Sequence, residues 1–127
     1  GKKIVAIISF SKDLLVDYIP EYGGNRNSES PCVVRLKYIP HSMVQSYSRI
    51  IAARLKNVND DRRVEVLHEI QKKQFVESVE GVSGYFLDGN EVVSPSEFYD
   101  TAPSELIYEL IKAMESSQKL SEGQRKN

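Results

Sequence analysis

Residues 16–25 constrain the fold of this chain more than any other segment. A strand-like apolar run reaches Pro20, which Tyr18 and Tyr22 flank, and Gly23-Gly24 follows within three residues. Proline cannot continue a strand ladder, and glycine reaches backbone angles that residues with a Cβ avoid. The chain must therefore turn sharply in this segment, which we call the elbow (residues 16–25). The elbow contains no nucleophile, metal cluster or phosphate-binding loop, so it favours binding over catalysis.

Length and composition predict one domain spanning residues 1–127, and the strand and helix patterns along it predict an α+β fold. The chain is 40% hydrophobic and 28% charged, which is typical of globular proteins and sufficient for a core. Its single cysteine, Cys32, excludes an internal disulfide and lies beside two valines, so we interpret it as a small buried hydrophobe. No run approaches the roughly 20 apolar residues of a membrane span, and we expect no membrane partner.

The first forty residues read as antiparallel β-sheet. Residues 3–10 and 14–19 are rich in Ile, Leu and Val, and residues 32–39 alternate apolar with polar side chains, as a strand with one solvated face does. A polar loop over residues 23–31 connects the second of these strands to the third. This part (1–40) forms the predicted N-terminal sheet.

Residues 41–120 read as mainly helical, with one small hairpin. Helical periodicity is present over 42–57, with Ser42 as N-cap, from 59 or 60 to a stop at Gly81, and over 103–120. Asp88-Gly89-Asn90 predicts a tight turn within a β-hairpin at 84–93. Ser94-Pro95 predicts a short helical turn, and residues 121–127 predict a flexible tail.

Charge is divided between the two halves of the chain. Residues 1–58 carry nine Lys/Arg and four Asp/Glu (+5), whereas residues 59–127 carry eight and fourteen (−6). Two interpretations remain open: the halves pack against each other within one domain, or copies associate head to tail. The basic residues are scattered and the pI is about 6.2, so we expect no nucleic-acid binding.

The sequence contains no recognisable catalytic pattern. The serine in Gly81-Val82-Ser83-Gly84 has the wrong spacing for a nucleophile elbow, and no phosphate-binding loop is present. His41 and His68 have no metal-ligand partners at suitable spacing and are expected to face solvent. We therefore predict a protein that is not an enzyme, with no cofactor and no metal.

Both ends of the chain resemble a known family. The segment Tyr18–Asn25 followed by the strand 33–37, and a final helix ending in Leu120-Ser121-Glu122-Gly123 with a Lys-Asn terminus, are similar to tail assembly chaperones of long-tailed bacteriophages and prophages. The resemblance covers about the first forty and the last thirty residues. It implies a non-catalytic protein that acts in the cytoplasm of the bacterial host cell. The implied partners are the tape-measure protein and, in some cases, the tail-tube protein.

Two other function classes remain alternatives: a structural tail or connector protein retained in the virion, and a regulatory nucleic-acid-binding protein. Self-association into a homo-oligomer would suit the chaperone role. The residues expected to contact a partner are Tyr18, Pro20, Tyr22, Asn25, Tyr47, Arg54, Leu106, Leu110, Met114 and Leu120. A competing interpretation is that the elbow only fixes the turn of the sheet and that the contact surface lies on the helices.

Overall fold

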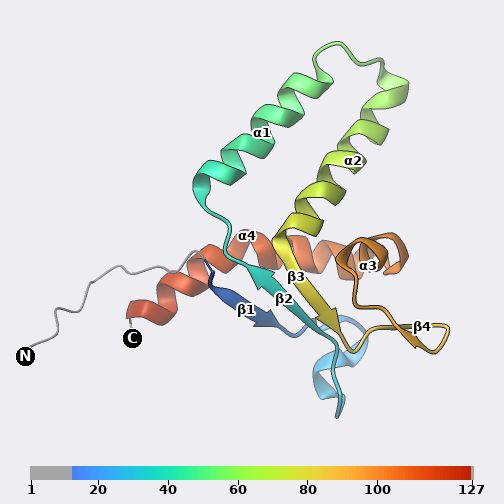
Figure 1. Cartoon of the computed structure of the whole chain (residues 1–127), viewed down its shortest axis with the longest axis vertical. Coiled ribbons are helices and arrows are strands. Elements are labelled where there is room, and N and C mark those ends of the chain that lie inside the picture. Colours follow the sequence, from blue (N-terminus) through green and yellow to red (C-terminus); the bar gives the residue numbers. More distant parts are fainter. Residues whose placement is uncertain (1–12, 127) are drawn as a thin grey trace, which may run out of the picture.

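The computed structural model describes the backbone of residues 13–126 and the side chains of residues 13–115, and it confirms an α+β fold (Figure 1). The expected strand at 3–10 lies outside the described residues. The elements in chain order are β1 (Leu15–Tyr18), the 3₁₀ helix η1 (Tyr22–Asn27), β2 (Val33–Lys37), α1 (His41–Leu55), α2 (Asp60–Ser78), β3 (Val79–Ser83), β4 (Phe86–Leu87), β5 (Asn90–Glu91), α3 (Pro95–Thr101) and α4 (Ser104–Lys126).

Three strands form an antiparallel sheet in the order β1-β2-β3. In register, Tyr18 lies opposite Val34, and Val34 lies opposite Val82. The predicted antiparallel pairing of the strand at 14–19 with the strand at 32–39 is confirmed by β1 and β2. Strand β3 was not expected, because the helical pattern of the second helix predicts that it continues to Gly81, where the structure instead has β3. The apolar spacing from Phe75 to Val79 is helical, and a glycine inside a strand resembles a helix stop, so this boundary was misplaced.

Helices α1 and α2 form an antiparallel hairpin, the arm, which is inserted between β2 and β3 and projects from the sheet (Figure 1). Both helices were predicted. The expected N-cap at Ser42 is wrong, because α1 is preceded by Pro40, and Ser42 lies inside the first turn without a capping bond. Tyr47 is the buried residue of α1, and its hydroxyl donates a hydrogen bond to Glu77 of α2.

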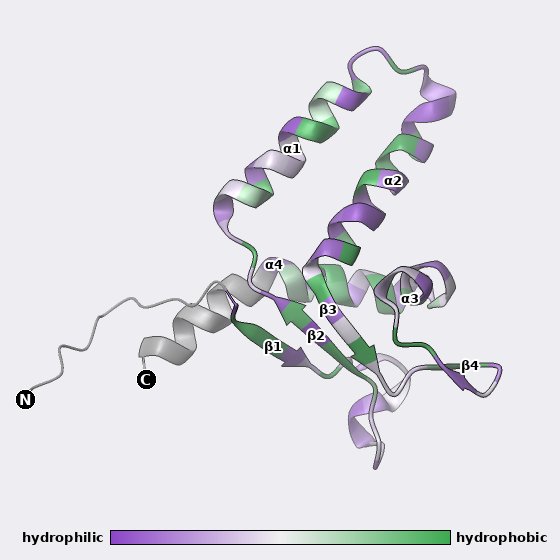
Figure 2. Cartoon of the chain, viewed as in Figure 1, coloured by the Kyte–Doolittle hydropathy of each residue, from purple (hydrophilic) through white to green (hydrophobic). Residues whose placement is uncertain are grey.

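The main core lies between the sheet and the two C-terminal helices. Its fully buried members include Val34 on β2, Phe98 on α3 and Leu110 on α4. The ring of Phe98 stacks on Phe75 and meets the edge of Tyr85. Figure 2 shows hydrophobic residues along the strands, whereas hydrophilic and hydrophobic residues alternate along the arm. Since α4 supplies core residues to the sheet, the chain's first and last described elements fold as one unit.

The small hairpin and the starts of the last two helices agree with the sequence. Asp88 and Gly89 have φ values of 51° and 80°, as a two-residue type I′ turn between β4 and β5 requires. Ser94 caps α3, because its Oγ accepts a hydrogen bond from the Glu97 backbone N–H at 3.4 Å. Helix α4 continues to Lys126, so residues 121–126 are helical where the sequence predicts a flexible tail.

Gly84 lies where the hairpin passes close to the start of β2. Its φ is 75°, and a Cβ at this position would lie 2.8 Å from the carbonyl oxygen of Pro31. Gly23 has a similar φ of 61° but open space around it. A substitution at Gly23 therefore tests backbone strain alone, whereas one at Gly84 tests backbone strain together with steric overlap.

We predict that Gly84→Ala destabilises the chain much more than Gly23→Ala. The left-handed backbone alone costs about 1–2 kcal/mol for a residue with a Cβ. The overlap with Pro31 adds roughly 1–3 kcal/mol at Gly84 only. Urea unfolding followed by circular dichroism measures both; equal losses for the two variants would contradict this close approach.

Candidate functional site

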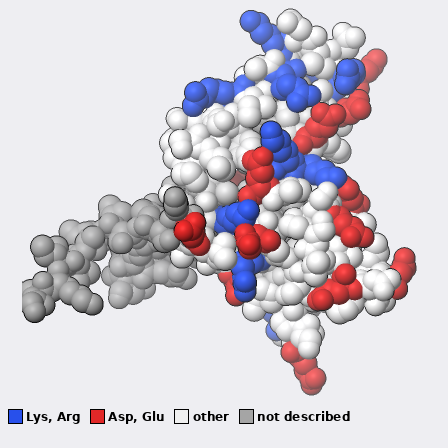
Figure 3. Space-filling model, in the orientation of Figure 1, with Lys and Arg blue, Asp and Glu red and all other residues white. Residues whose placement is uncertain are grey.

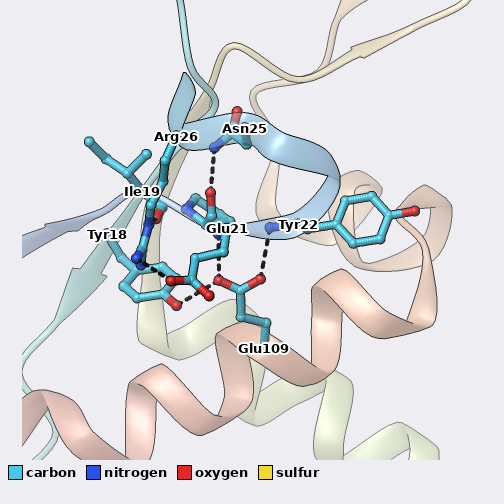
Figure 4. Close-up of polar contacts among 8 residues, drawn as sticks. Tyr18, Ile19, Glu21, Tyr22, Asn25, Arg26 and Glu109 are labelled. Carbon is cyan, nitrogen blue, oxygen red and sulfur yellow. Dashed lines mark hydrogen bonds and ion pairs between the residues drawn. The ribbon is translucent and has the colours of Figure 1, made fainter. Parts of the chain in front are cut away.

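A single carboxylate ties the elbow to α4. The Tyr18 hydroxyl donates a hydrogen bond to Glu109 Oε2 at 2.6 Å, and the Glu21 backbone N–H donates to the same oxygen at 2.8 Å. The Tyr22 backbone N–H donates to Glu109 Oε1 at 3.1 Å (Figure 4). Charge-assisted bonds of this kind are stronger than bonds between neutral groups. Glu109 therefore fixes the position of the elbow on the C-terminal helix.

Asn25 closes the elbow on itself. Its amide nitrogen donates to the carbonyl oxygens of Pro20 (2.8 Å) and Cys32 (3.0 Å), and its Oδ1 accepts from the Cys32 backbone N–H at 2.8 Å. Gly23 and Gly24 take left-handed φ values of 61° and 75° between these contacts. The polar loop therefore begins with a compact 3₁₀ turn held by one side-chain amide.

Arg26, the residue directly after the elbow, makes further contacts that hold it. Its Nε donates to the Ile19 carbonyl at 2.7 Å, and its guanidinium forms an ion pair with Glu21 at 2.6 Å. The same guanidinium lies 5.7 Å from the centroid of the Tyr18 ring, within cation–π range. Local contacts thus shape the elbow, and Glu109 places it on the fold.

The Glu109 contacts change the acidity of both partners. Burial alone would raise the pKa of Glu109, but the hydrogen bonds from Tyr18 and from the two backbone N–H groups outweigh it and lower the pKa below its usual value. Burial, followed by the hydrogen bond to Glu109, raises the pKa of Tyr18 to about 12. Both shifts stabilise the fold across neutral pH, because each favours the protonation state that makes the bond.

A pocket of about 350 Å³ opens beside the elbow. The elbow, the start of β2, the β3–β4 connection and the α3–α4 junction supply its walls. The lining residues are Pro20, Tyr22, Asn25, Cys32, Tyr85, Thr101, Pro103 and Leu106. Figure 4 shows the Tyr22 ring directed away from the Glu109 carboxylate. Tyr22 therefore binds Glu109 through its backbone N–H and lines the pocket with its side chain. Its side chain is partly exposed and forms part of the rim.

Three polar side chains of the pocket, those of Asn25, Tyr85 and Thr101, are already engaged. The Tyr85 hydroxyl donates to Thr101 Oγ1 at 3.3 Å, and that hydroxyl donates to the Glu97 carbonyl at 2.8 Å. Asn25 is used within the elbow. Burial raises the pKa of the Cys32 thiol, which keeps it protonated and a poor nucleophile at neutral pH. The arrangement can therefore hold an apolar group and has no activated nucleophile among these residues.

The pocket brings together four of the predicted contact residues: Pro20, Tyr22, Asn25 and Leu106. Tyr18 lies next to it and is bound to Glu109, while Met114 packs partly buried against the main core.

The other predicted contact residues do not join the pocket. Leu110 is fully buried in the core, and Tyr47 is 5% exposed between the helices of the arm, so neither presents a surface in the folded chain. Arg54 is paired with Glu69 within the arm at 3.1 Å. The side chain of Leu120 lies outside the described side chains.

Sequence reasoning missed the residues that complete the site from the C-terminal half. Glu109 lies three residues after Leu106 on α4. Residues three apart are neighbours on a helix surface, so the Glu109 carboxylate lies next to the apolar stripe that packs on the sheet. That spacing is the one local signal for it. Tyr85 and Pro103 carried no signal, because only the fold places them opposite the elbow.

Comparison with known proteins gave no match to this chain among protein-family models, curated protein sequences or solved structures. Within residues 13–126, none of the helices combines the length and hydropathy needed to cross a bilayer. The described side chains include no group of three or more His, Cys, Asp or Glu residues arranged to hold a metal ion.

We predict that Glu109→Gln destabilises the chain by about 2 kcal/mol at pH 7, the scale of hydrogen bonds to a charged group. The amide retains one acceptor oxygen, but its NH₂ group faces a donor. Glu115→Gln, at an exposed position on the same helix, is the matched control. Urea unfolding at pH 7 measures both, and equal stabilities would contradict the role of Glu109.

The wild type and Glu109→Gln together also test how the stabilisation by Glu109 depends on pH. Because the folded pKa of Glu109 lies below its ordinary value of 4.5, its stabilisation is complete above that value and is lost as pH falls through the folded pKa. The difference in unfolding free energy between the wild type and Glu109→Gln should therefore shrink below about pH 4.5. A difference that stays constant down to pH 3 would show that Glu109 is not the titrating group.

Proposed function

We propose that this chain is a non-catalytic protein-binding subunit that anchors an apolar side chain of a client protein in the pocket beside the elbow. Following the resemblance of its two ends, the proposed client is the tape-measure protein of a long-tailed bacteriophage, and the role is that of a tail assembly chaperone. The observation that carries the proposal is a solvent-accessible pocket with a largely apolar lining, in which the side-chain polar groups of Asn25, Tyr85 and Thr101 already have partners.

The size and lining of the pocket indicate the chemistry of the occupant. A volume of about 350 Å³ is at the small end of ligand sites and suits one or two large side chains. A polar occupant would find few unused donors or acceptors. Tyr22 on the rim and Tyr85 on the opposite wall supply the rigid aromatic surface that dominates many protein interfaces.

A tape-measure protein has the properties of such a client. It is long, helical and apolar before the tail tube encloses it, and helical clients present anchors at intervals of three, four and seven residues. One anchor per site would cover an apolar stripe that otherwise aggregates. The tail-tube protein is a second client that this role would allow. The proposed setting is the cytoplasm of the bacterial host during assembly.

We predict that Tyr22→Ala weakens client binding about tenfold or more, the scale of a lost aromatic hot spot. The backbone N–H that binds Glu109 is retained. Tyr108→Ala is the matched control, because this tyrosine is 64% exposed and does not line the pocket. The assay is co-purification and titration with a tape-measure protein encoded in the same phage or prophage genome.

Alkylation of Cys32 provides a readout that does not depend on a variant. Because this thiol lines the pocket, a bound client should slow its reaction with N-ethylmaleimide. If a tape-measure protein neither binds nor protects Cys32, the proposed client is wrong. If the chain is instead found stoichiometrically in purified virions, the structural tail-protein alternative replaces the chaperone role.

A further inference from the structure

The segment from β3 to the start of α4 forms an acidic surface. Residues 80–105 contain six Asp/Glu and no Lys or Arg. Figure 3 shows acidic side chains over the part of the molecule that contains α3 and the β4–β5 hairpin. Two large apolar side chains of this segment, Phe86 on β4 and Val93 just after β5, are each 60% exposed. A surface of this composition suits a basic partner that also carries apolar groups.

These apolar and acidic side chains share the outer face of the hairpin. Phe86 lies opposite Glu91 in the β4–β5 ladder, and Val93 follows two residues after Glu91. Directly opposed residues of a ladder share one face, so Phe86 and Glu91 lie on the same side of the hairpin. The Glu91 carboxylate also accepts a hydrogen bond from the Gly84 backbone N–H at 3.0 Å. Val93, just beyond the end of β5, is exposed as well. Val92 points inward and is buried in the core. We call Phe86, Glu91, Val93 and the nearby Glu97 the acidic patch.

The free end of the arm has the opposite character. Residues 49–63 contain five Lys/Arg and two Asp. Arg54 and Arg62 form ion pairs within the arm, whereas Arg49, Lys56 and Arg63 have no acidic partner within 4 Å among the described residues. Figure 3 shows basic side chains gathered at this upper end of the molecule.

Apolar side chains accompany these charges. Val64 is 62% exposed and Ile50 is 36% exposed. We call Arg49, Lys56, Arg63, Ile50 and Val64 the basic tip.

The basic tip and the acidic patch cannot meet within one chain. The arm projects away from the sheet, with its free end far from the β4–β5 hairpin (Figure 1). Within the described chain, the main packing partner of α1 is α2. The complementary surfaces can therefore meet only between molecules, and a contact between two different surfaces is heterologous.

We propose that the basic tip of one copy of this chain docks on the acidic patch of the next copy. Each copy then has one donor surface and one acceptor surface, so association continues into a ring or an open chain. The charges orient the approach, and contacts of Ile50 and Val64 with Phe86 and Val93 exclude water. The contact does not rest on the proposed function, because it uses residues outside the pocket lining.

Analytical ultracentrifugation of the purified full chain tests this contact. At about 50 mM salt the weight-average mass should rise with protein concentration beyond that of a dimer, and at about 500 mM salt it should fall, because exposed charges are screened. A mass equal to the monomer at every concentration in low salt would overturn the proposal. A mass that levels off at a dimer would also overturn it, because a closed dimer requires a self-complementary contact.

Charge reversal identifies the two surfaces. The tip-reversed variant carries Arg49→Glu and Arg63→Glu, and the patch-reversed variant carries Glu91→Lys and Glu97→Lys. Neither should associate alone, because its two surfaces have the same sign. An equimolar mixture should associate, since the acidic tip of one variant meets the basic patch of the other. A mixture that stays monomeric, with both variants folded by circular dichroism, contradicts the proposed pairing.

An apolar variant tests the contact without changing a charge. Phe86→Ser should weaken association about tenfold, whereas Tyr108→Ser, at a position 64% exposed and outside both surfaces, should leave it unchanged. Equal effects of the two substitutions would show that general surface hydrophobicity, not this patch, drives association. Tyr22→Ala should associate as the wild type does, which separates this contact from client binding.

Discussion

The carboxylate of Glu109 holds the N-terminal elbow on the C-terminal helix. The three donors that it gathers come from residues 87 to 91 positions away in the chain. Two of these donors are backbone N–H groups just after Pro20, so the interaction positions the backbone itself. Leu106 lies one turn earlier on the same helix and forms a wall of the pocket. The interaction that joins the ends of the fold therefore also sets the distance between two walls of the site.

The arm interrupts the sheet without preventing its completion. Strands β2 and β3 are neighbours although α1 and α2 separate them in the sequence, and Val34 still lies opposite Val82. The two helices of the arm are joined by the Tyr47–Glu77 hydrogen bond and the Arg54–Glu69 ion pair. The base of α2 also belongs to the main core, because Phe75 stacks on Phe98 and Lys72 pairs with Asp100 of α3. The arm is therefore anchored at its base, while its free end projects from the sheet (Figure 1).

The elements with local signals could be predicted from the sequence, and the site could be predicted only in part. Helical periodicity identified α1, α2 and α4, and the Asp-Gly turn identified the β4–β5 hairpin. Strand β3 was missed because its local pattern continued a helix and only pairing with β2 defines it. The elbow was recognised, but its partner was not, because Glu109 acts through contacts of very long sequence separation. The interpretation of the elbow as a turn-fixing element agrees with these bonds, and the pocket shows that the same residues also shape a cavity.

The β4–β5 hairpin connects the two proposed binding surfaces. Tyr85, at its start, lines the pocket, while Phe86, the next residue, lies on the outer face with the acidic patch. Adjacent residues of a strand point to opposite sides, so the short β4–β5 hairpin would lie between the bound client and the neighbouring copy of the chain. The two proposed contacts therefore use opposite sides of a hairpin whose strands are two residues long.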